Sequence, residues 1–537
     1  MSPSLSRRTF VTTTVAAGAG VALGAAAEPA LATPAEVRTG PRIAIIGSGY
    51  GGAVAARSLA QAGRRVDLIE MGADWEAMAS GKGAVFTSMR SPNERSMWFK
   101  RRTDMPFSYL GGMDIVNRPI KPGAGVLDVE TFAEMKVYVG RGVGGGSLVN
   151  GGMAVTPVRS FFEKVLPQVD AEEMYSTYFP RARRNLIVTD PPADIVLNSP
   201  WYQFARVSAQ QAKRAGYGHR MVPNVYDFDY LRRETFGQVP RSALAAEVMF
   251  GNNYGKNSLP KSILREALAT GRVNLMPMTE VTRLTQRPDG AFDLSLRRID
   301  FWGSLLEERT ATYDRVVLAA GSIGTARLLA KAQHQGTIKH LPPGLGGGWG
   351  PNGNVMVARR LWGTPTGAHQ STIPVMGVTN WDDSPQSVFA EIAPFPTGIE
   401  LYTGVYLAIT NNPNHGEFSW DAQTNTLRLN WDRGKAKPGV DAARAFFDRI
   451  NRASRNTSYR SDVFERHQEF ADYFSYHPLG GAVLGEVTDL SGEVKGVPGL
   501  FVMDGSLIPG KIGVNPFVTI TALAERNMDR LLAGRRF

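Results

Sequence analysis

The feature that most constrains the fold of this chain is a glycine-rich turn near its start. An apolar run over residues 42–46 leads into Gly-Ser-Gly-Tyr-Gly-Gly at residues 47–52, and an alanine-rich stretch follows at 53–62. Residues 66–70 then have the composition of a second strand. Strand, glycine turn, helix and strand in this order predict a βαβ unit, and the spacing Gly-x-Gly-x-x-Gly inside such a unit is typical of dinucleotide-binding proteins.

Each glycine of this turn has an expected physical task. Gly47 permits the tight turn, Gly49 lets a pyrophosphate approach the backbone, and Gly52 lets the helix pack closely on the strand. The N–H groups and the dipole at the start of the helix would bind the phosphates. Glu70, 18 residues beyond Gly52, is expected to accept hydrogen bonds from the adenosine ribose. NAD and FAD share this motif, so it does not choose between them.

The first 32 residues are expected to be an export signal. Arg7 and Arg8 precede an uncharged run of small and apolar residues at 11–27, and Ala30-Leu31-Ala32 offers a cleavage site. Paired arginines before such a run are typical of the twin-arginine pathway, which exports folded proteins. We therefore expect cleavage near Ala32 and a secreted, soluble protein. The alternative, a membrane anchor, is less favoured because the run is only mildly hydrophobic.

Patterns further along the chain predict that the dinucleotide-binding fold is assembled from separate pieces. Apolar strands are expected at 315–320 and 500–503, each followed by a glycine turn and a helix. Between them, alternating stretches typical of antiparallel strands lie at 354–362, 371–381 and 399–410. The expected fold class is α/β: a Rossmann-like domain from discontinuous segments, plus a second domain with a mostly antiparallel sheet covered by helices.

The domain boundaries follow from these patterns. The dinucleotide-binding domain is predicted to comprise residues 40–74, 105–188, 256–346 and 485–537. The second domain, which would hold the substrate, is predicted to comprise 75–104, 189–255 and 347–484. Large apolar side chains within residues 75–110 could form a lid over a pocket or belong to the core; they are Trp75, Met78, Phe86, Met97, Trp98, Phe99 and Met105.

Composition excludes several kinds of chemistry. The 537 residues contain no cysteine, so disulfides, thiolate metal sites, iron–sulfur clusters and a cysteine nucleophile are ruled out. The seven histidines show no pair at helical metal-site spacing, and no metal is expected. A net charge of +11 either keeps the surface solvated or favours contact with anionic lipid. No nucleic-acid recognition motif accompanies this charge.

Further candidate site residues lie in a second glycine cluster and near the chain's end. The cluster covers residues 140–153 and could lie against a flat ring or a pyrophosphate. Asp504, directly after a predicted strand, could hold the ribityl and phosphate end of a cofactor. Asn515 is placed to cap the last helix, which would begin at Pro516. The stretch 505–511 nearly matches a P-loop but lacks its Ser or Thr, so ATP hydrolysis is rejected.

Two side chains are candidates for acid–base chemistry. His477 precedes a proline, a position where histidine is often only a structural hydrogen-bonding group. Glu391 is flanked by apolar residues, and if its side chain pointed inward its pKa would rise enough for proton transfer near neutral pH. In an alternating strand the simpler expectation is that Glu391 points to water.

These motifs, in this order, resemble the glucose–methanol–choline (GMC) oxidoreductases. The resemblance rests on residues 47–52, 140–153 and 321–329 and on the pairs His477-Pro478 and Asn515-Pro516. It is greatest to the branch of secreted bacterial sterol oxidases, which bind FAD without a covalent link, and it implies FAD as the cofactor. The residues that would contact FAD are Tyr50, Gly51, Glu70, Gly146, Asn150, Gly151, Met153, Val281, Gly505 and Phe517.

The resemblance also implies a reaction. A 3β-hydroxysteroid such as cholesterol would be oxidised by molecular oxygen, giving hydrogen peroxide, and the 5-ene-3-one formed would be isomerised to the 4-ene-3-one. His477 would bind the substrate hydroxyl with Asn515 as its polar partner, and Glu391 would be the isomerisation base. The expected partners are sterol, oxygen and, transiently, a bilayer surface, with the enzyme a monomer. The alternatives are a GMC enzyme for another alcohol, or an exported lipid-binding or membrane-active flavoprotein.

Overall fold

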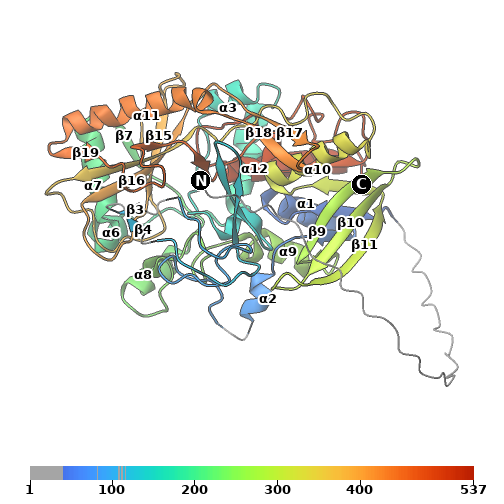
Figure 1. Cartoon of the computed structure of the whole chain (residues 1–537), viewed down its shortest axis with the longest axis horizontal. Coiled ribbons are helices and arrows are strands. Elements are labelled where there is room, and N and C mark those ends of the chain that lie inside the picture. The colour runs from blue at the N-terminus through green and yellow to red at the C-terminus, as the bar shows by residue number, and fades with distance from the viewer. Residues whose placement is uncertain (1–39, 81–82, 107–108, 111–112, 115) are drawn as a thin grey trace. The chain divides into compact units, whose positions relative to one another are not determined.

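The computed structural model describes residues 40–80, 83–106, 109–110, 113–114 and 116–537 (Figure 1). The predicted export signal at 1–32 lies outside these residues. Within the described ranges, no helix is both long enough and apolar enough to cross a membrane.

A five-stranded parallel sheet joins the start, middle and end of the described chain. Its order is β22-β12-β1-β2-β8, and the strands are β22 (Leu500–Val502), β12 (Arg315–Leu318), β1 (Ile43–Ile46), β2 (Val66–Ile69) and β8 (Val273–Met276). The central strand β1 is buried along its whole length, as expected of a parallel strand covered on both faces. The predicted strands at 42–46, 66–70, 315–320 and 500–503 are thus confirmed, and β8 is an edge strand that the sequence did not reveal.

Helices from distant parts of the chain cover this sheet. Helix α1 (Tyr50–Gln61) follows the glycine turn and packs against α9 (Ile263–Ala269) and the last helix, α12 (Phe517–Ala533). Helix α10 (Gly321–Gln335) follows β12 and packs on the hairpin sheet formed by β9 (Thr279–Gln286), β10 (Phe292–Ile299) and β11 (Leu305–Tyr313). The Rossmann-like part of the predicted fold is confirmed.

A second, seven-stranded sheet has the order β19-β13-β16-β15-β14-β7, with β20 beside β13. Its strands are β7 (Gly218–Met221), β13 (Asn354–Leu361), β14 (Met376–Thr379), β15 (Val388–Ala393), β16 (Thr403–Thr410), β19 (Thr457–Tyr459) and β20 (Phe470–Ala471), and their pairs are antiparallel. Helices α7 (Gln203–Arg214) and α11 (Arg433–Ala453) share an apolar core with the sheet, and α11 lies across it in Figure 1. The strand predicted at 371–381 is shorter, because residues 371–375 form a loop.

Smaller elements complete the described chain. The short strands are β3 (Tyr109–Leu110), β4 (Met113–Asp114), β5 (Leu127–Thr131), β6 (Lys136–Gly140), β17 (Glu417–Asp421), β18 (Thr426–Asn430) and β21 (Phe474–Ser475). The remaining α-helices are α2 (Trp75–Ala79), α3 (Arg159–Val165), α4 (Ala171–Glu173), α5 (Phe179–Asn185), α6 (Ala193–Asn198) and α8 (Phe228–Thr235). Residues 40–537 form one compact unit, so the domain boundaries proposed above stay predictions.

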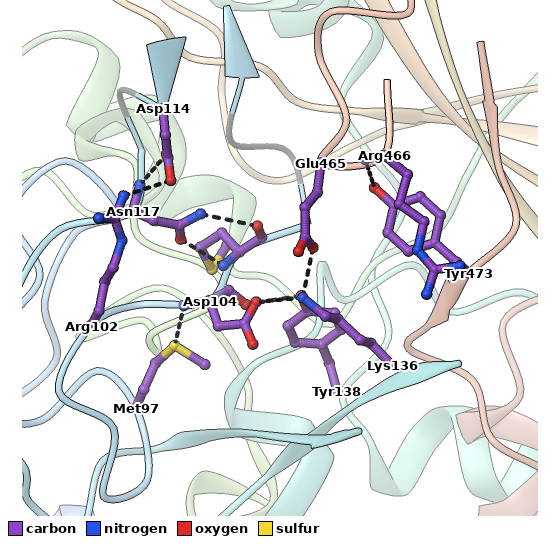
Figure 2. Close-up of polar contacts among 11 residues, drawn as sticks. Met97, Arg102, Asp104, Asp114, Asn117, Lys136, Tyr138, Glu465, Arg466 and Tyr473 are labelled. Atoms are coloured by element: carbon purple, nitrogen blue, oxygen red, sulfur yellow. Dashed lines mark hydrogen bonds and ion pairs between the residues drawn. The ribbon is translucent and has the colours of Figure 1, made fainter. Parts of the chain in front are cut away.

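The segment that could have been a lid contributes to the core. Trp75, Met97 and Met105 are at most 1% exposed and belong to a cluster that continues into β5 and β6. Polar contacts, shown in Figure 2, attach this segment to its neighbours. Lys136 Nζ lies between Asp104 Oδ1 (2.9 Å) and Glu465 Oε2 (2.6 Å). For these three apolar residues the interpretation as core is therefore confirmed.

Candidate active site

A cavity of about 400 Å³ brings the predicted site residues together. Its lining includes the first glycine turn, the second glycine cluster, and residues from the antiparallel sheet and the start of α12. Of the predicted site residues, only Gly52 is not part of the lining. Those that line it are Gly47, Gly49, Tyr50, Gly51, Glu70, Gly146, Asn150, Gly151, Met153, Val281, Glu391, His477, Asp504, Gly505, Asn515 and Phe517.

The glycines of the first turn have different steric reasons for being glycine. Gly47 has φ +97°, and a Cβ there would lie 2.3 Å from the carbonyl oxygen of Ala319. A Cβ on Gly52 would lie 2.0 Å from the carbonyl oxygen of Gly47, so the helix packs on the turn without space for a side chain. A Cβ on Gly49 would meet no protein atom within 4 Å and would project into open space. This open space at the start of α1 is where a pyrophosphate fits.

Glu70 lies at the end of β2 and holds the turn in place. Its Oε2 accepts hydrogen bonds from the backbone N (3.1 Å) and the Oγ (2.7 Å) of Ser48, and its Oε1 accepts one from Gly72 N (2.9 Å). Oε1 therefore retains acceptor capacity, and Glu70 lines the cavity. The contact of Glu70 with a ribose stays a prediction.

The second glycine cluster folds against the first turn. Gly144 N donates to Ser48 Oγ at 3.0 Å, and a short 3₁₀ turn follows at Gly145–Leu148. Further on, Asn150 Nδ2 donates to the hydroxyl of Tyr50, whose ring stacks on Phe517 with centroids 5.1 Å apart. The cluster therefore joins the first turn to the N-terminus of α12.

Asp504 fixes two glycine turns, the one between β12 and α10 and the one that follows β22. Its Oδ2 accepts from Gly321 N (2.9 Å) and Thr325 Oγ1 (2.6 Å), and its Oδ1 accepts from Ser506 N (2.9 Å). Burial is the main cause that raises the pKa of this carboxyl. Because Asp504 ties the end of β22 to the start of α10, it positions the backbone around Gly505 at the cavity wall.

Glu391, His477 and Asn515 meet from three separate elements. Glu391 lies in β15, His477 follows β21, and Asn515 precedes α12. Asn515 Nδ2 lies 3.0 Å from Glu391 Oε1 and 3.5 Å from His477 Nε2. A carboxyl, an imidazole and an amide thus share one corner of the cavity.

The environment of Glu391 raises its pKa to about 8, because burial disfavours the charged form and the bond from Asn515 only partly opposes this. The side chain is 4% exposed, and its Oε2 has no hydrogen-bond partner among the described residues. The expectation that Glu391 points to water is therefore wrong. Strand β15 is an interior strand covered on both faces, so alternation along it does not distinguish solvent from core.

Burial lowers the pKa of His477 to about 3, so its ring is neutral at physiological pH. The side chain of Asn515 does not cap the last helix, contrary to expectation. Helix α12 has Pro516 at its N-cap position and no side-chain capping bond, because the Asn515 amide is turned toward Glu391 and His477 instead.

Three functional candidates carry no motif in the sequence. Asn354 Nδ2 lies 3.1 Å from His477 Nδ1. The Tyr476 hydroxyl, at the cavity, is buried without a partner among the described residues. Lys256 is 2% exposed and donates to the carbonyl oxygen of Asn150, and burial lowers its pKa well below the usual range. Only the position of Tyr476 next to His477 could have drawn attention beforehand.

Comparisons with known proteins agree with this geometry. Models of the GMC oxidoreductase C-terminal region match residues 352–465 and 412–524, and a model of the NAD(P)-binding Rossmann-like domain matches 45–75. A cholesterol oxidase from Acinetobacter baumannii is 22% identical over 91% of this chain and 94% of its own length. One from Mycobacterium tuberculosis is 24% identical over 90% of each chain.

Solved structures show the same fold. A fungal aryl-alcohol oxidase superposes with a TM-score of 0.62 at 13% identity, over 93% of this chain and 100% of its own. A pyridoxine 4-oxidase from Mesorbium loti superposes with a TM-score of 0.57 at 15% identity, over 92% of this chain and 99% of its own. The family models, the relatives aligned along nearly the whole chain and the fold all agree with a GMC oxidoreductase whose cofactor is FAD.

Proposed function

We propose that this GMC oxidoreductase is an exported oxidase of 3β-hydroxysteroids such as cholesterol that also isomerises the steroid ketone it forms. The observation that carries the proposal is the buried Glu391, joined through Asn515 to His477 in a cavity shared with the cofactor turns. Alcohol oxidation alone does not need a carboxyl whose pKa is raised to about 8. The cholesterol oxidases among the relatives support the choice of substrate.

FAD, when bound, supplies the acceptor for a hydride from the alcohol carbon and returns the electrons to oxygen as hydrogen peroxide. The residues that would hold it are those of the two glycine clusters, with Tyr50, Glu70, Val281, Asp504, Gly505 and Phe517. They fit FAD because the cavity leaves open space in front of Gly49 at the N-terminus of α1.

The substrate part of the cavity is apolar. Hydrocarbon side chains there would bury a steroid ring system and exclude water from the hydroxyl; they include Met89, Leu127, Val149, Val248, Met249, Met356 and Leu407. His477 would bind the hydroxyl and orient the carbinol hydrogen. Glu391 would then remove a proton from carbon 4 of the 5-ene-3-one and return it at carbon 6, so no proton is lost or gained overall.

We propose export by the twin-arginine route, with cleavage near Ala32, on the evidence of the N-terminal sequence. A transient contact with a bilayer surface, as the sterol source, and a monomeric enzyme complete the proposal. The positive net charge supports the lipid contact.

Anaerobic mixing with cholesterol in detergent tests the proposal. We expect the absorbance of the oxidised flavin to disappear within one turnover, and hydrogen peroxide and the 4-ene-3-one to form when air is admitted. Bleaching by an aryl or other non-steroid alcohol, but not by sterol, would place the enzyme in another branch of the family. Sterol binding without bleaching by any alcohol would instead identify a lipid-binding flavoprotein.

Gly49→Ala is expected to weaken FAD binding without loss of the fold. The added Cβ meets no protein atom within 4 Å but enters the space in front of α1. Forcing a methyl group into a packed contact costs about 1–3 kcal/mol, which corresponds to roughly 5- to 150-fold in affinity. FAD titration of the apoprotein and circular dichroism measure the two effects.

Two further glycine variants serve as comparisons for this result. Gly344→Ala is the control, because its Cβ would meet only Val487, at 3.9 Å, outside the cavity. Gly51→Ala should impair folding itself, since its Cβ would overlap the carbonyl oxygen of Met503. Wild-type FAD affinity in Gly49→Ala would show that the pyrophosphate does not lie against this turn.

A further inference from the structure

The ring of His477 lies between two side-chain amides. Asn354 Nδ2 is 3.1 Å from Nδ1, and Asn515 Nδ2 is 3.5 Å from Nε2. An amide nitrogen donates hydrogen bonds and does not accept them. A neutral imidazole has one acceptor nitrogen and one N–H, so it can accept from only one of the two amides.

The distances decide between them. A separation of 3.1 Å is an ordinary hydrogen-bond length, whereas 3.5 Å is beyond the usual range. The amide of Asn515 also has a better acceptor, Glu391 Oε1 at 3.0 Å. Nδ1 of His477 is therefore the acceptor, and the ring proton is on Nε2, the nitrogen on the side of Asn515 and Glu391.

Asn354 is held firmly for this contact. It begins β13, where its backbone pairs with Ile409 of β16, and it is 3% exposed. The preceding turn is tied down because Asn352 Nδ2 donates to Val514 O and Ile512 N donates to Asn352 Oδ1, both at 2.8 Å. The Oδ1 of Asn354 is buried without a partner among the described residues. Among the described residues, the bond from Nδ2 to His477 is therefore the one hydrogen bond that the Asn354 side chain makes.

We propose that Asn354 is a positioning residue that keeps the proton of His477 on Nε2, so that His477 donates a hydrogen bond to the alcohol oxygen. This inference rests on alcohol oxidation, which the family supplies, and is independent of the steroid substrate. It assigns Asn354 the task of selecting a tautomer, although it lies on the far side of the ring from Asn515.

A pair of variants separates this role from packing. Asn354→Asp has the shape of the native residue but can only accept, so it draws the proton to Nδ1. Asn354→Ala removes the contact and leaves both tautomers accessible. We expect the rate of flavin reduction to fall at least about 100-fold in Asn354→Asp, and less in Asn354→Ala. A packing role predicts the reverse order, because alanine leaves a hole and aspartate does not; that order would overturn the proposal.

The pH profile gives a second readout. A carboxylate beside Nδ1 raises the pKa of His477, so the kcat/KM profile of Asn354→Asp should show a new ionisation that is absent from wild type and Asn354→Ala. The ionisable groups near the ring are Glu391, beyond Asn515, and Tyr476; both are present in all three proteins. FAD content and thermal stability, measured for each variant, identify any that fails to fold.

The tautomer can also be measured without substrate or variant. In FAD-loaded protein with ¹⁵N-labelled histidine, the signal of His477 is assigned by its absence in His477→Gln. We expect a protonated Nε2 and an unprotonated Nδ1. The opposite tautomer would refute the role of Asn354 whatever the substrate is. Conversely, failure to oxidise sterol would affect only the proposed substrate.

Discussion

Replacing His477 by alanine is expected to lower the rate of flavin reduction by the alcohol about 10²- to 10³-fold, the usual cost of removing one hydrogen-bond donor to a reacting oxygen, while FAD content stays near that of wild type. The ring lines the cavity, and among the described residues its two nitrogens contact only asparagine amides, so its loss removes a contact to substrate and no bond to the cofactor turns. Stopped-flow absorbance without oxygen measures the rate.

His369→Ala is the matched control, because this exposed histidine packs on the Trp201 ring and lies outside the cavity. It should retain full activity. If His477→Ala lost FAD and activity in equal proportion, the histidine would have a structural role only.

Glu391→Gln is expected to separate the two halves of the proposed reaction. Isomerisation of added 5-ene-3-one should fall about 10²- to 10⁴-fold, because a neutral amide cannot take a proton from carbon 4. Oxidation should fall much less, since the amide oxygen of glutamine can still accept the hydrogen bond from Asn515 that Glu391 Oε1 accepts in the wild type. The ultraviolet absorbance of the conjugated 4-ene-3-one reports isomerisation, and peroxide reports oxidation. Glu417→Gln, on the exposed position of β17, is the control.

The same residue sets an expected pH dependence. Burial raises the pKa of Glu391 to about 8, and only its deprotonated form is a base. Isomerisation by the wild-type enzyme should therefore increase with pH and level off above about pH 8. Full-rate isomerisation by Glu391→Gln, or a rate independent of pH between 6 and 9, would assign the proton transfer to another group.

The cofactor half of the site could be predicted from the sequence because its signals are local. A tight turn, a close approach of backbone and a helix start each need glycine within a few residues of a strand. The structure shows these constraints at Gly47 and Gly52. The edge strand β8 was missed because its short, half-exposed sequence carries no comparable signal.

The arrangement of Glu391, His477 and Asn515 could be predicted only in part, because its geometry depends on contacts between distant segments. The direction of Glu391 is set by the neighbours of β15 on both sides, β14 and β16, and not by its own flanking residues. Asn515 has the sequence context of a helix cap, but Glu391, 124 positions away, provides a better partner. Asn354 is an asparagine at a strand start, and only the folded chain places it beside His477.

The position of β22 and α12 has a consequence for how the enzyme is made. The turn at residues 47–52 is completed by Met503 and packed by α12, which are synthesised long after the turn itself. At about 5–20 residues per second, the turn is synthesised roughly 20–90 s before Met503. The complete turn therefore forms only after these later segments have been synthesised. The nascent chain must keep its β1 region available until Met503 and α12 have been synthesised.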